Sequence, residues 1–528
     1  MCTPSMIPYP DLAGAQFTSL SASLVSNVTL QILGSLYVNN GPLDVQGVSF
    51  CHVKTTYTHI GTTDNVTVEL YLPEDGWNGR MQGVGGGGWI AGGTDFFLTN
   101  STMLAAVSEG YSAVTTNGGH SFLSGNDWLL QSSGEINHQI LEVFASTSLN
   151  ELSIIGKAVI ESYYGRPPLY SYWNGCSFGG RQGMELASRY PTAFNGIAAA
   201  APAINFIGIL MGNLWPQIVM KEMGEYPKNC ELLAITKAAV EYCDGKDGLK
   251  YGMIFDPDDC DFDPRSVINE TITCDDTGVS EIIRISEAAV KVAEAVWAGA
   301  RTSDDRFLWW GLKKGARLVE QPLGHFVNPG IATTVCSRNG TCTGKPTPVS
   351  DQAIRLLVKK DLNFDVSSIT ANEFEEIFGA TVEEYAVLDI NPNLDAFRDA
   401  GGKILSYHGL YDAIVPPDAT RDYFNSIAAR DSQVHDYYRV FEAPGLAHCH
   451  SGAGGYYPSG IFKALVSWVE SNATPDTLVA STPSRNGSFQ EGILCPYPQK
   501  PHYNGLRVEY YDESGLFGTS ADDFYCDE

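Results

Sequence analysis

The pentapeptide 175–179 reads Gly-Cys-Ser-Phe-Gly, and its residue types suggest chemistry more directly than any other part of the chain. It has the form G-x-S-x-G, in which small neighbours let a serine occupy a tight turn between a strand and a helix. The aromatic run 169–173 before it is typical of a strand, and residues 180–189 after it favour a helix. A serine at the start of a helix is well placed for developing negative charge. Ser177 is therefore the predicted nucleophile.

A serine hydroxyl needs a general base, because it is almost fully protonated at neutral pH. Proteins with this strand-turn-helix serine supply the partners in the chain order serine, acid, histidine, each on a loop after a strand. Asp412 follows the predicted strand 402–408, and His448 follows the predicted strand 437–441 and a turn. We therefore predict Asp412 as the orienting acid and His448 as the base, with His450 as the rival base.

An oxyanion hole needs two backbone N–H groups. The residue after the nucleophile supplies one of them in this arrangement, and that residue is Phe178. The second is expected from the loop 85–89, where four consecutive glycines let the backbone approach a substrate closely. Within that loop, Gly87 and Gly88 are the two candidates.

The elements that must position these residues alternate between strands and helices over residues 45–201, which predicts a mostly parallel sheet covered on both faces. Predicted strands are 66–72, 81–84, 111–115 and 169–173, and predicted helices are 139–162 and 282–298. Residues 205–395 lack the alternation, which returns at 402–408. We expect an α/β core from 1–204 and 396–528, with 205–395 as a large inserted domain.

Composition excludes some partners and favours an oxidising compartment. The chain has 61 acidic and 33 basic residues, which disfavours nucleic acid and anionic membrane surfaces as partners. No apolar run reaches about 18 residues, so no membrane span is expected. Twelve cysteines fall partly in local pairs such as Cys243/Cys260 and Cys336/Cys342, and none has zinc-site spacing.

Seven N-x-S/T sequons together with the even cysteine count indicate a secreted, N-glycosylated protein whose leader has been removed. The sequons begin at Asn27, Asn65, Asn100, Asn269, Asn339, Asn472 and Asn486.

Cys176 precedes the predicted nucleophile, and Cys449 follows the predicted base. If Ser177 and His448 lie within hydrogen-bond reach, these two cysteines come within disulfide range. The alternative is that each cysteine pairs elsewhere.

These motifs resemble the fungal tannase and feruloyl esterase family, which also includes bacterial hydrolases of polyester monomers. The matching segments are 85–89, 174–183 and 408–412, and the resemblance covers nearly the whole chain. It implies an α/β-hydrolase fold in which the inserted domain is a lid over the active site. In that family the cysteines beside the serine and the histidine are bridged, which corresponds here to Cys176 and Cys449.

The family's lid carries a calcium site with a pattern like C-D-x-x-D-G-x-x-D-G-x-I. The resemblance assigns the side chains of Asp244 and Asp247 and the main-chain oxygens of Leu249 and Met253 as ligands. Tyr251 stands where the family has an aspartate, so one carboxylate is missing. Because calcium affinity falls with fewer charged ligands, we expect calcium to bind more weakly here than to a Tyr251→Asp variant.

The resemblance implies a carboxylic-ester hydrolase that acts on small phenolic-acid esters and needs no cofactor for catalysis. The runs 56–61 and 226–232 look closer to fungal tannases, so galloyl esters of tannins are the first expectation. A feruloyl, or other cinnamoyl, esterase is the alternative within the class. The alternative from another class is a hydrolase-fold binding protein that has lost catalysis, which predicts a damaged triad.

Overall fold

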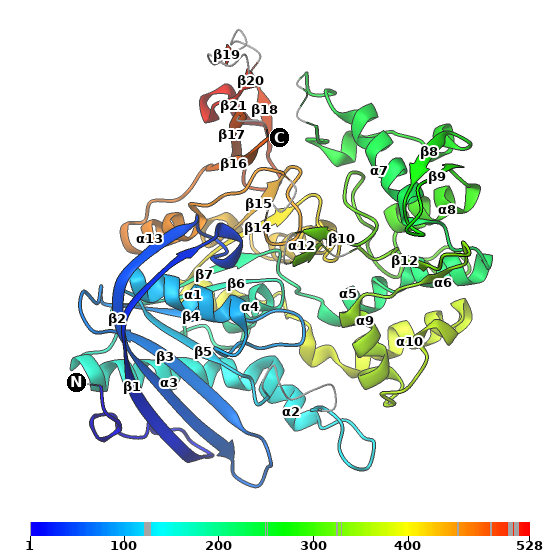
Figure 1. The fold of residues 1–528 in the computed structure, drawn as a ribbon. Coiled ribbons are helices and arrows are strands. Elements are labelled where there is room, and N and C mark those ends of the chain that lie inside the picture. Colours follow the sequence, from blue (N-terminus) through cyan, green and yellow to red (C-terminus); the bar gives the residue numbers. More distant parts are fainter. Residues whose placement is uncertain are drawn as a thin grey trace.

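The computed structural model describes residues 2–120, 128–248, 250, 252–323, 326–328, 330–450, 454–485, 488–504, 510–511 and 517–527. Its centre is a nine-stranded sheet in the order β1-β2-β3-β5-β4-β6-β7-β14-β15 (Figure 1). Neighbours from β1 to β5 pair antiparallel, and those from β5 to β15 pair parallel. The strands are β1 (Ala15–Ile32), β2 (Leu43–His59), β3 (Val66–Pro73), β4 (Arg80–Val84), β5 (Ser112–Thr116), β6 (Tyr170–Cys176), β7 (Gly196–Ala200), β14 (Lys403–Gly409) and β15 (Tyr438–Ala443).

Helices cover both faces of this sheet. One hydrophobic cluster joins the sheet to α1 (Phe97–Ser108) and α13 (Ile461–Ser471). The other cluster joins it to α3 (Ser148–Tyr164), α4 (Phe178–Arg189) and α12 (Pro417–Ala428). Strands such as β3, β5 and β7 are buried along their whole length, as expected for strands covered on both faces. The predicted α/β architecture is confirmed.

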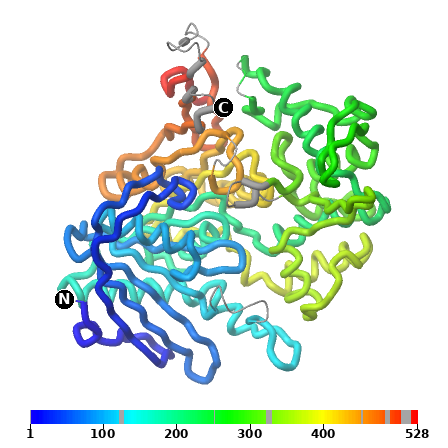
Figure 2. The backbone as a smooth tube through the Cα atoms, viewed as in Figure 1, coloured from blue at the N-terminus to red at the C-terminus, as the bar shows by residue number. Residues whose placement is uncertain are grey.

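The chain between β7 and β14 leaves the sheet and lies to one side of it, as the green and yellow tube in Figure 2 shows. We call residues 205–395 the insertion. Its helices are α5 (Phe206–Gly212), α6 (Trp215–Met223), α7 (Asn229–Cys243), α8 (Glu287–Ala298), α9 (Pro348–Ala353) and α10 (Ala371–Glu384), with α11 (Asp395–Asp399) at its end. Its hairpins pair β8 (Thr271–Cys274) with β9 (Glu281–Arg284), β10 (Gln321–Leu323) with β11 (Phe326–Asn328), and β12 (Thr334–Cys336) with β13 (Cys342–Gly344).

The insertion shares one hydrophobic cluster with the core, in which Phe206 and Leu210 of α5 pack with Phe144 and Phe178. A second cluster, around α7 and α8, lies within the insertion apart from Tyr411 and Ile414 at its margin. The base of the insertion is therefore continuous with the sheet domain, and the limits at 204/205 and 395/396 stay a prediction.

Small antiparallel pairs follow α13. They join β16 (Leu478–Arg485) to β17 (Ser488–Leu494), β18 (Lys500–Tyr503) to β21 (Phe524–Asp527), and β19 (Tyr510–Tyr511) to β20 (Phe517–Gly518).

Two predicted helices differ in extent from the observed ones. The helix predicted over 282–298 begins only at residue 287, because the first residues form β9 and pair with β8, and the Ser286 side chain then caps α8. The helix predicted over 139–162 is divided into α2 (His138–Glu142), a π-helical turn at 143–147 and α3. Its residues are helical as predicted, but the hydrogen-bond register changes within it.

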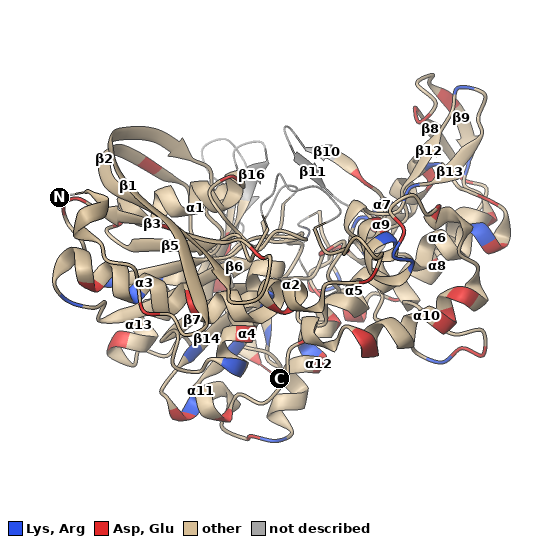
Figure 3. Ribbon diagram, turned by 90° about the horizontal axis from the view of Figure 1, so that it is seen from below, with Lys and Arg blue, Asp and Glu red and all other residues tan. Residues whose placement is uncertain are grey.

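All twelve cysteines form disulfides, which include the two predicted local pairs. The bridges are Cys2–Cys51, Cys176–Cys449, Cys230–Cys274, Cys243–Cys260, Cys336–Cys342 and Cys495–Cys526. Acidic residues are spread over the outer helices, α10 among them, and are not gathered in one patch (Figure 3). Among the described residues, no helix has the length and apolar character needed to cross a membrane.

A buried charged cluster fastens the end of β2 to helix α3. The two ring nitrogens of His59 contact carboxylate oxygens of Asp64 and Glu151, the second at 2.7 Å. Tyr57 donates a hydrogen bond to the other Glu151 oxygen at 2.6 Å. Burial lowers the pKa of His59, but the hydrogen bonds that its ring donates to the two carboxylates outweigh this effect, and the net pKa is raised above 6.5.

Because of this cluster, we expect the stability difference between wild type and a His59 variant to depend on pH. A raised histidine pKa contributes stability that is fully present below pH 6.5 and is lost as the pH rises through the folded value. We expect His59→Gln to lower the melting temperature by a few degrees at pH 5 and by less at pH 9. The control is His502→Gln, which replaces an exposed histidine on β18 and should lower the melting temperature less than His59→Gln does at pH 5. Equal destabilisation by His59→Gln at both pH values would contradict a charged His59.

Candidate active site

Ser177 occupies the turn between β6 and α4, with φ 60° and ψ −123°. A positive φ is unusual for a residue with a side chain and is a form of backbone strain found at functional sites. The turn is held on both sides, because the Ser177 N–H donates to the Ala200 carbonyl and the Ser177 carbonyl accepts from Arg181 and Ala203 N–H groups. A Cβ on Gly175 would lie 2.3 Å from the carbonyl oxygen of residue 179, so only glycine fits there.

Asp412 and His448 meet at the carboxyl ends of β14 and β15, which are adjacent parallel strands. His448 Nδ1 lies 2.6 Å from Asp412 Oδ2. The other carboxylate oxygen accepts the backbone N–H groups of Ile414 and Val415 at 3.0 and 2.9 Å. Asp412 is fully buried, so its position is fixed by these contacts.

His408, the first residue of the matching segment 408–412, is a neighbour of this pair for which no role was predicted. It is buried at the end of β14, and its Nε2 lies 3.2 Å from Asp412 Oδ2 and 2.9 Å from the Val415 carbonyl. Burial raises the pKa of Asp412, but the charge of His448 and hydrogen bonds from both histidines outweigh it and hold the pKa well below its usual range. The carboxylate is therefore ionised across the acidic and neutral range.

His450, the rival base, has a different environment. Its ring packs against Tyr457 with 4.8 Å between centroids, and burial lowers its pKa to about 4. No carboxylate partner of His450 is found among the described residues. The structure therefore brings Asp412 to His448 and not to His450.

The bridge between Cys176 and Cys449 joins the residues beside Ser177 and His448, with 5.9 Å between the Cα atoms. A ring nitrogen of His448 and the two sulfur atoms lie within 4.8 Å of one another. Ser177 and His448 line the same cavity. The disulfide thus ties the serine turn to the histidine loop across 273 residues of sequence.

The two candidate glycines for the oxyanion hole differ in their hydrogen bonds. The Gly87 N–H donates to the Ile90 carbonyl at 2.9 Å and is therefore occupied. Within the described part of the chain, neither the Gly88 N–H nor the Phe178 N–H donates to a protein acceptor. Gly88 has a φ of +58°, a conformation that favours glycine.

Gln182 holds the glycine loop against the nucleophile helix, a role that sequence reasoning missed. Its fully buried side-chain amide accepts the Gly86 N–H at 3.1 Å and donates to the Ala91 carbonyl at 2.8 Å. Its place five residues after Ser177 gave no signal by itself, because only the folded structure shows that this position on α4 faces the loop. The amide keeps Gly88 next to the turn.

A cavity of about 340 Å³ opens over Ser177. Its walls are mostly aliphatic and aromatic, and they come from the N-terminal region, the glycine loop, the insertion and the loop after Asp412. Among the described residues that line it, none is Asp, Glu, Lys or Arg. The aliphatic and aromatic side chains are Leu36, Val38, Val84, Phe96, Leu98, Ala203, Phe206, Ile209, Leu210, Val349, Ile414 and Val415.

The predicted calcium loop is only partly described, because Leu249 and Tyr251 lie outside the described residues. One carboxylate oxygen of Asp244 accepts the Gly252 N–H at 3.0 Å, and Asp247 lines a cavity beside Cys243. Met253, whose main-chain oxygen is the other predicted ligand, is buried. Two carboxylates and two main-chain oxygens are fewer than the six to eight oxygens that calcium takes, so calcium binding stays a prediction.

A serine on a strand-turn-helix, beside an aspartate-histidine pair at the carboxyl edge of a mostly parallel sheet, is the arrangement of α/β-hydrolase-fold serine hydrolases. The chain belongs to the tannase and feruloyl esterase family, whose model matches residues 51–511. It is an enzyme, a serine carboxylic-ester hydrolase, and its fold is that of an α/β-hydrolase with a large insertion.

Relatives in this family carry feruloyl esterase names. The chain is 37% identical over 491 residues to a probable feruloyl esterase of Arthroderma benhamiae, covering 91% of this chain and 86% of the relative. It is 28% identical to feruloyl esterase B of Aspergillus niger, covering 87% of this chain and 84% of the relative.

Two solved structures share the fold. A tannin acyl hydrolase from Aspergillus niger has a TM-score of 0.84 at 25% identity, with 97% of this chain and 95% of that chain covered. Feruloyl esterase B from Aspergillus oryzae has a TM-score of 0.74 at 23% identity, with 98% and 97% covered.

Proposed function

We propose that this enzyme hydrolyses esters of phenolic acids through an acyl-enzyme formed on Ser177. The observation that carries the mechanism is the 2.6 Å contact between His448 Nδ1 and Asp412 Oδ2. It keeps the proton of the neutral imidazole on Nδ1, so Nε2 is the acceptor that takes the Ser177 proton. All three members of the triad are present, which argues against a binding protein that has lost catalysis.

The reaction proceeds in two halves. Ser177 Oγ attacks the ester carbonyl while His448 takes its proton, and the N–H groups of Gly88 and Phe178 stabilise the oxyanion. The imidazolium then protonates the leaving alcohol, and the acyl group stays on Ser177. Water, deprotonated by His448, attacks the acyl-enzyme and releases the acid.

The acyl group that the cavity suits best is a hydroxycinnamoyl group such as feruloyl. A galloyl ring carries three hydroxyl groups, and burying hydroxyls without hydrogen-bond partners is costly. The described lining has no charged side chain, and its polar residues Thr99, Thr102 and Asn213 already donate to backbone carbonyls. This ranking reverses the first expectation from the sequence, and the relatives named feruloyl esterases support it. Galloyl esters remain the second candidate, favoured by the likeness to the tannin acyl hydrolase.

The test compares methyl ferulate with methyl gallate on one purified sample. We expect kcat/KM for methyl ferulate to exceed that for methyl gallate by about tenfold or more, the scale expected when buried hydroxyls lack partners. A Ser177→Ala sample prepared in the same way gives the background. Faster hydrolysis of methyl gallate would reverse the ranking, and equal rates for wild type and Ser177→Ala would remove the proposed mechanism.

Extracellular location and N-glycosylation are part of the same proposal. Six disulfides favour an oxidising compartment. Five sequon asparagines are exposed: Asn27, Asn65, Asn269, Asn339 and Asn472. Asn100 is only partly exposed and accepts a hydrogen bond from Tyr71, so we expect it to carry less glycan, while Asn486 lies outside the described residues.

The disulfide beside the active site leads to a prediction about positioning. The Cys176→Ala/Cys449→Ala double variant should lose about a hundredfold in kcat at temperatures where it stays folded, because an error of about 1 Å between nucleophile and base has that effect. The matched control is Cys336→Ala/Cys342→Ala, which removes a bridge across 6 residues within the insertion. Methyl ferulate kinetics and melting curves on both variants check it. Equal losses in kcat for the two double variants would show that the Cys176–Cys449 bridge does not act by positioning Ser177 and His448.

A further inference from the structure

Arg181 is a fully buried arginine on α4, four residues after Ser177, and the mechanism proposed above does not use it. Its backbone N–H donates to the Ser177 carbonyl at 2.9 Å. Burial lowers the pKa of Arg181, because removing a charged guanidinium from water is costly. A buried guanidinium therefore needs a partner for each of its nitrogens, and these partners show which parts of the chain Arg181 joins.

All three guanidinium nitrogens of Arg181 donate to backbone carbonyls. Nε donates to Leu388 at 2.7 Å and Nη2 to Val387 at 2.9 Å, at the end of the 3₁₀-helix Ala386–Leu388. Nη1 donates to Ala145 at 2.6 Å, in the π-helical turn before α3. One planar group thus joins the helix that follows the nucleophile to the last part of the insertion and to a second helix of the sheet domain.

The segment that Arg181 holds lies beside the start of the insertion. Asp389, the residue after that 3₁₀-helix, forms a β-bridge with Asn205, so the first and last parts of the insertion meet there. Helix α5 begins directly after Asn205, and its first residue, Phe206, lines the cavity over Ser177. Arg181 therefore fastens the base of the insertion, which forms part of the cavity wall, to α4.

The guanidinium also covers the side chain of a proposed oxyanion donor. It lies over the ring of Phe178, 5.3 Å from the ring centroid. That buried ring stacks on Phe144 with 4.6 Å between centroids and packs against Phe206 at 5.0 Å. Arg181 thus contacts the residue whose backbone N–H must point at the oxyanion, and Gln182, the next residue, holds the glycine loop that supplies the other donor.

We propose that Arg181 is a positioning residue for the oxyanion hole, which fixes the Phe178 N–H by holding α4 against the base of the insertion. This assignment rests on the ester hydrolysis and the oxyanion donors proposed above. Such a donor stabilises the negative charge that develops on the ester oxygen, so its contact is stronger in the transition state than in the bound substrate. Loss of its alignment should therefore lower kcat and leave KM nearly unchanged.

Arg181→Lys tests this role, because lysine keeps the positive charge but has one nitrogen in place of three. With methyl ferulate, or methyl gallate if that ester is the better substrate, we expect kcat to fall by about ten- to a hundredfold. Complete loss of one oxyanion donor costs about 10²–10³-fold in kcat, and a displaced donor should cost less. KM should stay within about threefold of wild type.

A trifluoromethyl ketone analogue of the ester gives a second readout, because addition of Ser177 to the ketone forms an oxyanion. Its affinity should fall in Arg181→Lys by about the same factor as kcat, since transition-state analogues depend on the same donors. Inhibition by the free product acid, which forms no tetrahedral oxyanion, should change much less.

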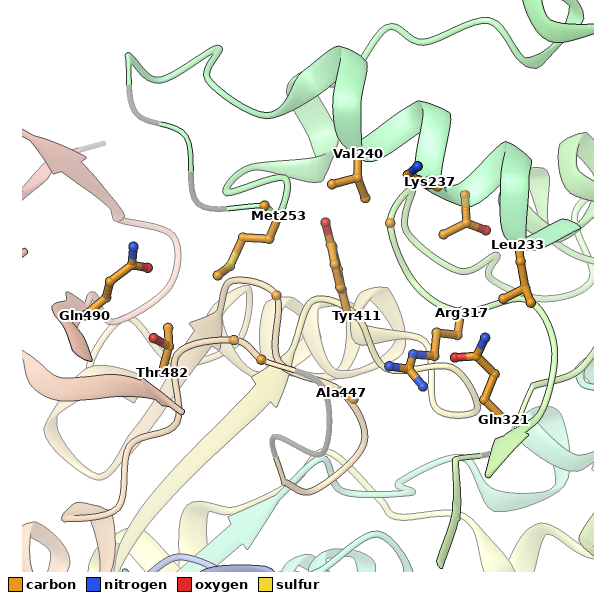
Figure 4. Close-up of a pocket in the computed structure, with 16 residues that line it drawn as sticks. Leu233, Lys237, Val240, Met253, Arg317, Gln321, Tyr411, Ala447, Thr482 and Gln490 are labelled. Atoms are coloured by element: carbon orange, nitrogen blue, oxygen red, sulfur yellow. The ribbon is translucent and has the colours of Figure 1, made fainter. Parts of the chain in front are cut away.

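Two other arginines provide matched controls. Arg189 is the last residue of α4 and pairs with Glu142 at 2.9 Å. Arg317, a half-buried arginine of the insertion, lines a separate cavity of about 360 Å³ that shares no lining residue with the cavity over Ser177 (Figure 4). Arg189→Lys and Arg317→Lys should each leave kcat within about twofold of wild type, because neither side chain holds an oxyanion donor.

A purely structural role gives a different result. Arg181→Lys would then lower the melting temperature, while the folded variant kept the wild-type kcat and affinity for the ketone, and this outcome would overturn the proposal. Equal losses of kcat in Arg181→Lys and in both controls would also overturn it. A wild type that hydrolyses the ester no faster than Ser177→Ala would instead refute the proposed function, and the role of Arg181 with it.

If Arg181→Lys does not fold, Phe178→Leu takes its place. Leucine removes the ring under the guanidinium and keeps the backbone N–H. We expect the same loss in kcat at nearly unchanged KM, because the donor is no longer held through its side chain. Wild-type kcat in folded Phe178→Leu would contradict positioning through this ring.

Discussion

Replacing His448 by alanine is expected to lower kcat for methyl ferulate by about 10⁴–10⁶-fold, the range seen when a triad base is removed from other serine hydrolases. The reason is that His448 is the histidine that contacts Asp412, at 2.6 Å, and lines the cavity over Ser177. Without it, no group in the described part of the site can accept the serine proton. Steady-state kinetics on a folded variant measure the loss.

His450→Ala is the matched control for this substitution. His450 lies two residues away, packs on Tyr457, and has a pKa lowered to about 4 by burial. Its replacement should leave kcat within about tenfold of wild type, and any loss should follow from altered packing. If His450→Ala were inactive and His448→Ala active, the general base would be His450 and not His448.

Asp412→Asn is expected to lower kcat by about 10⁴-fold, as the same change does in a serine protease triad. The carboxylate accepts hydrogen bonds from the His448 ring and from two backbone N–H groups. An asparagine amide can turn its NH₂ group toward His448 and so favour the wrong tautomer. The fold should persist, because the side chain keeps its volume.

The low pKa of Asp412 also makes the stability of the folded protein depend on pH. A carboxyl whose folded pKa is depressed contributes stability that is present above its unfolded value of 3.8 and is lost as the pH falls through the folded value. The stability difference between wild type and Asp412→Asn should therefore shrink in strong acid. An Asp412→Asn variant that retains a tenth of the wild-type kcat would mean that another group orients His448.

Much of the fold could be predicted because the local sequence patterns favour the same secondary structure that the packed fold contains. Strands such as β3 and β4 were predicted to within a residue or two, since their alternating or small-residue runs match buried positions in a sheet. The helix over 282–298 was predicted too long. The apolar residues among 282–284 continue the helical spacing of the residues after them. They pair with β8 instead, and this pairing cannot be predicted from the local sequence pattern.

Ser177, Asp412 and His448 could be proposed from the sequence because each follows a strand in a fixed chain order, and their catalytic roles stay a prediction. His408 and Gln182 could not, because their roles depend on which buried atoms they face: Asp412 and Val415 in one case, the glycine loop in the other. Substrate preference was the property that was hardest to predict from the sequence. The cavity wall joins Leu36, Phe206 and Val349, which are distant in sequence and meet only in the folded chain.

Labelling with a fluorophosphonate, followed by peptide mapping, identifies the nucleophile, because such a reagent phosphonylates an activated serine hydroxyl. We expect one phosphonyl group per chain, located on Ser177, with activity lost in proportion to labelling. The His448→Ala variant, which lacks the base, should label far more slowly. Complete inactivation with the label on another serine, or full activity with Ser177 labelled, would contradict the assignment of Ser177 as the nucleophile.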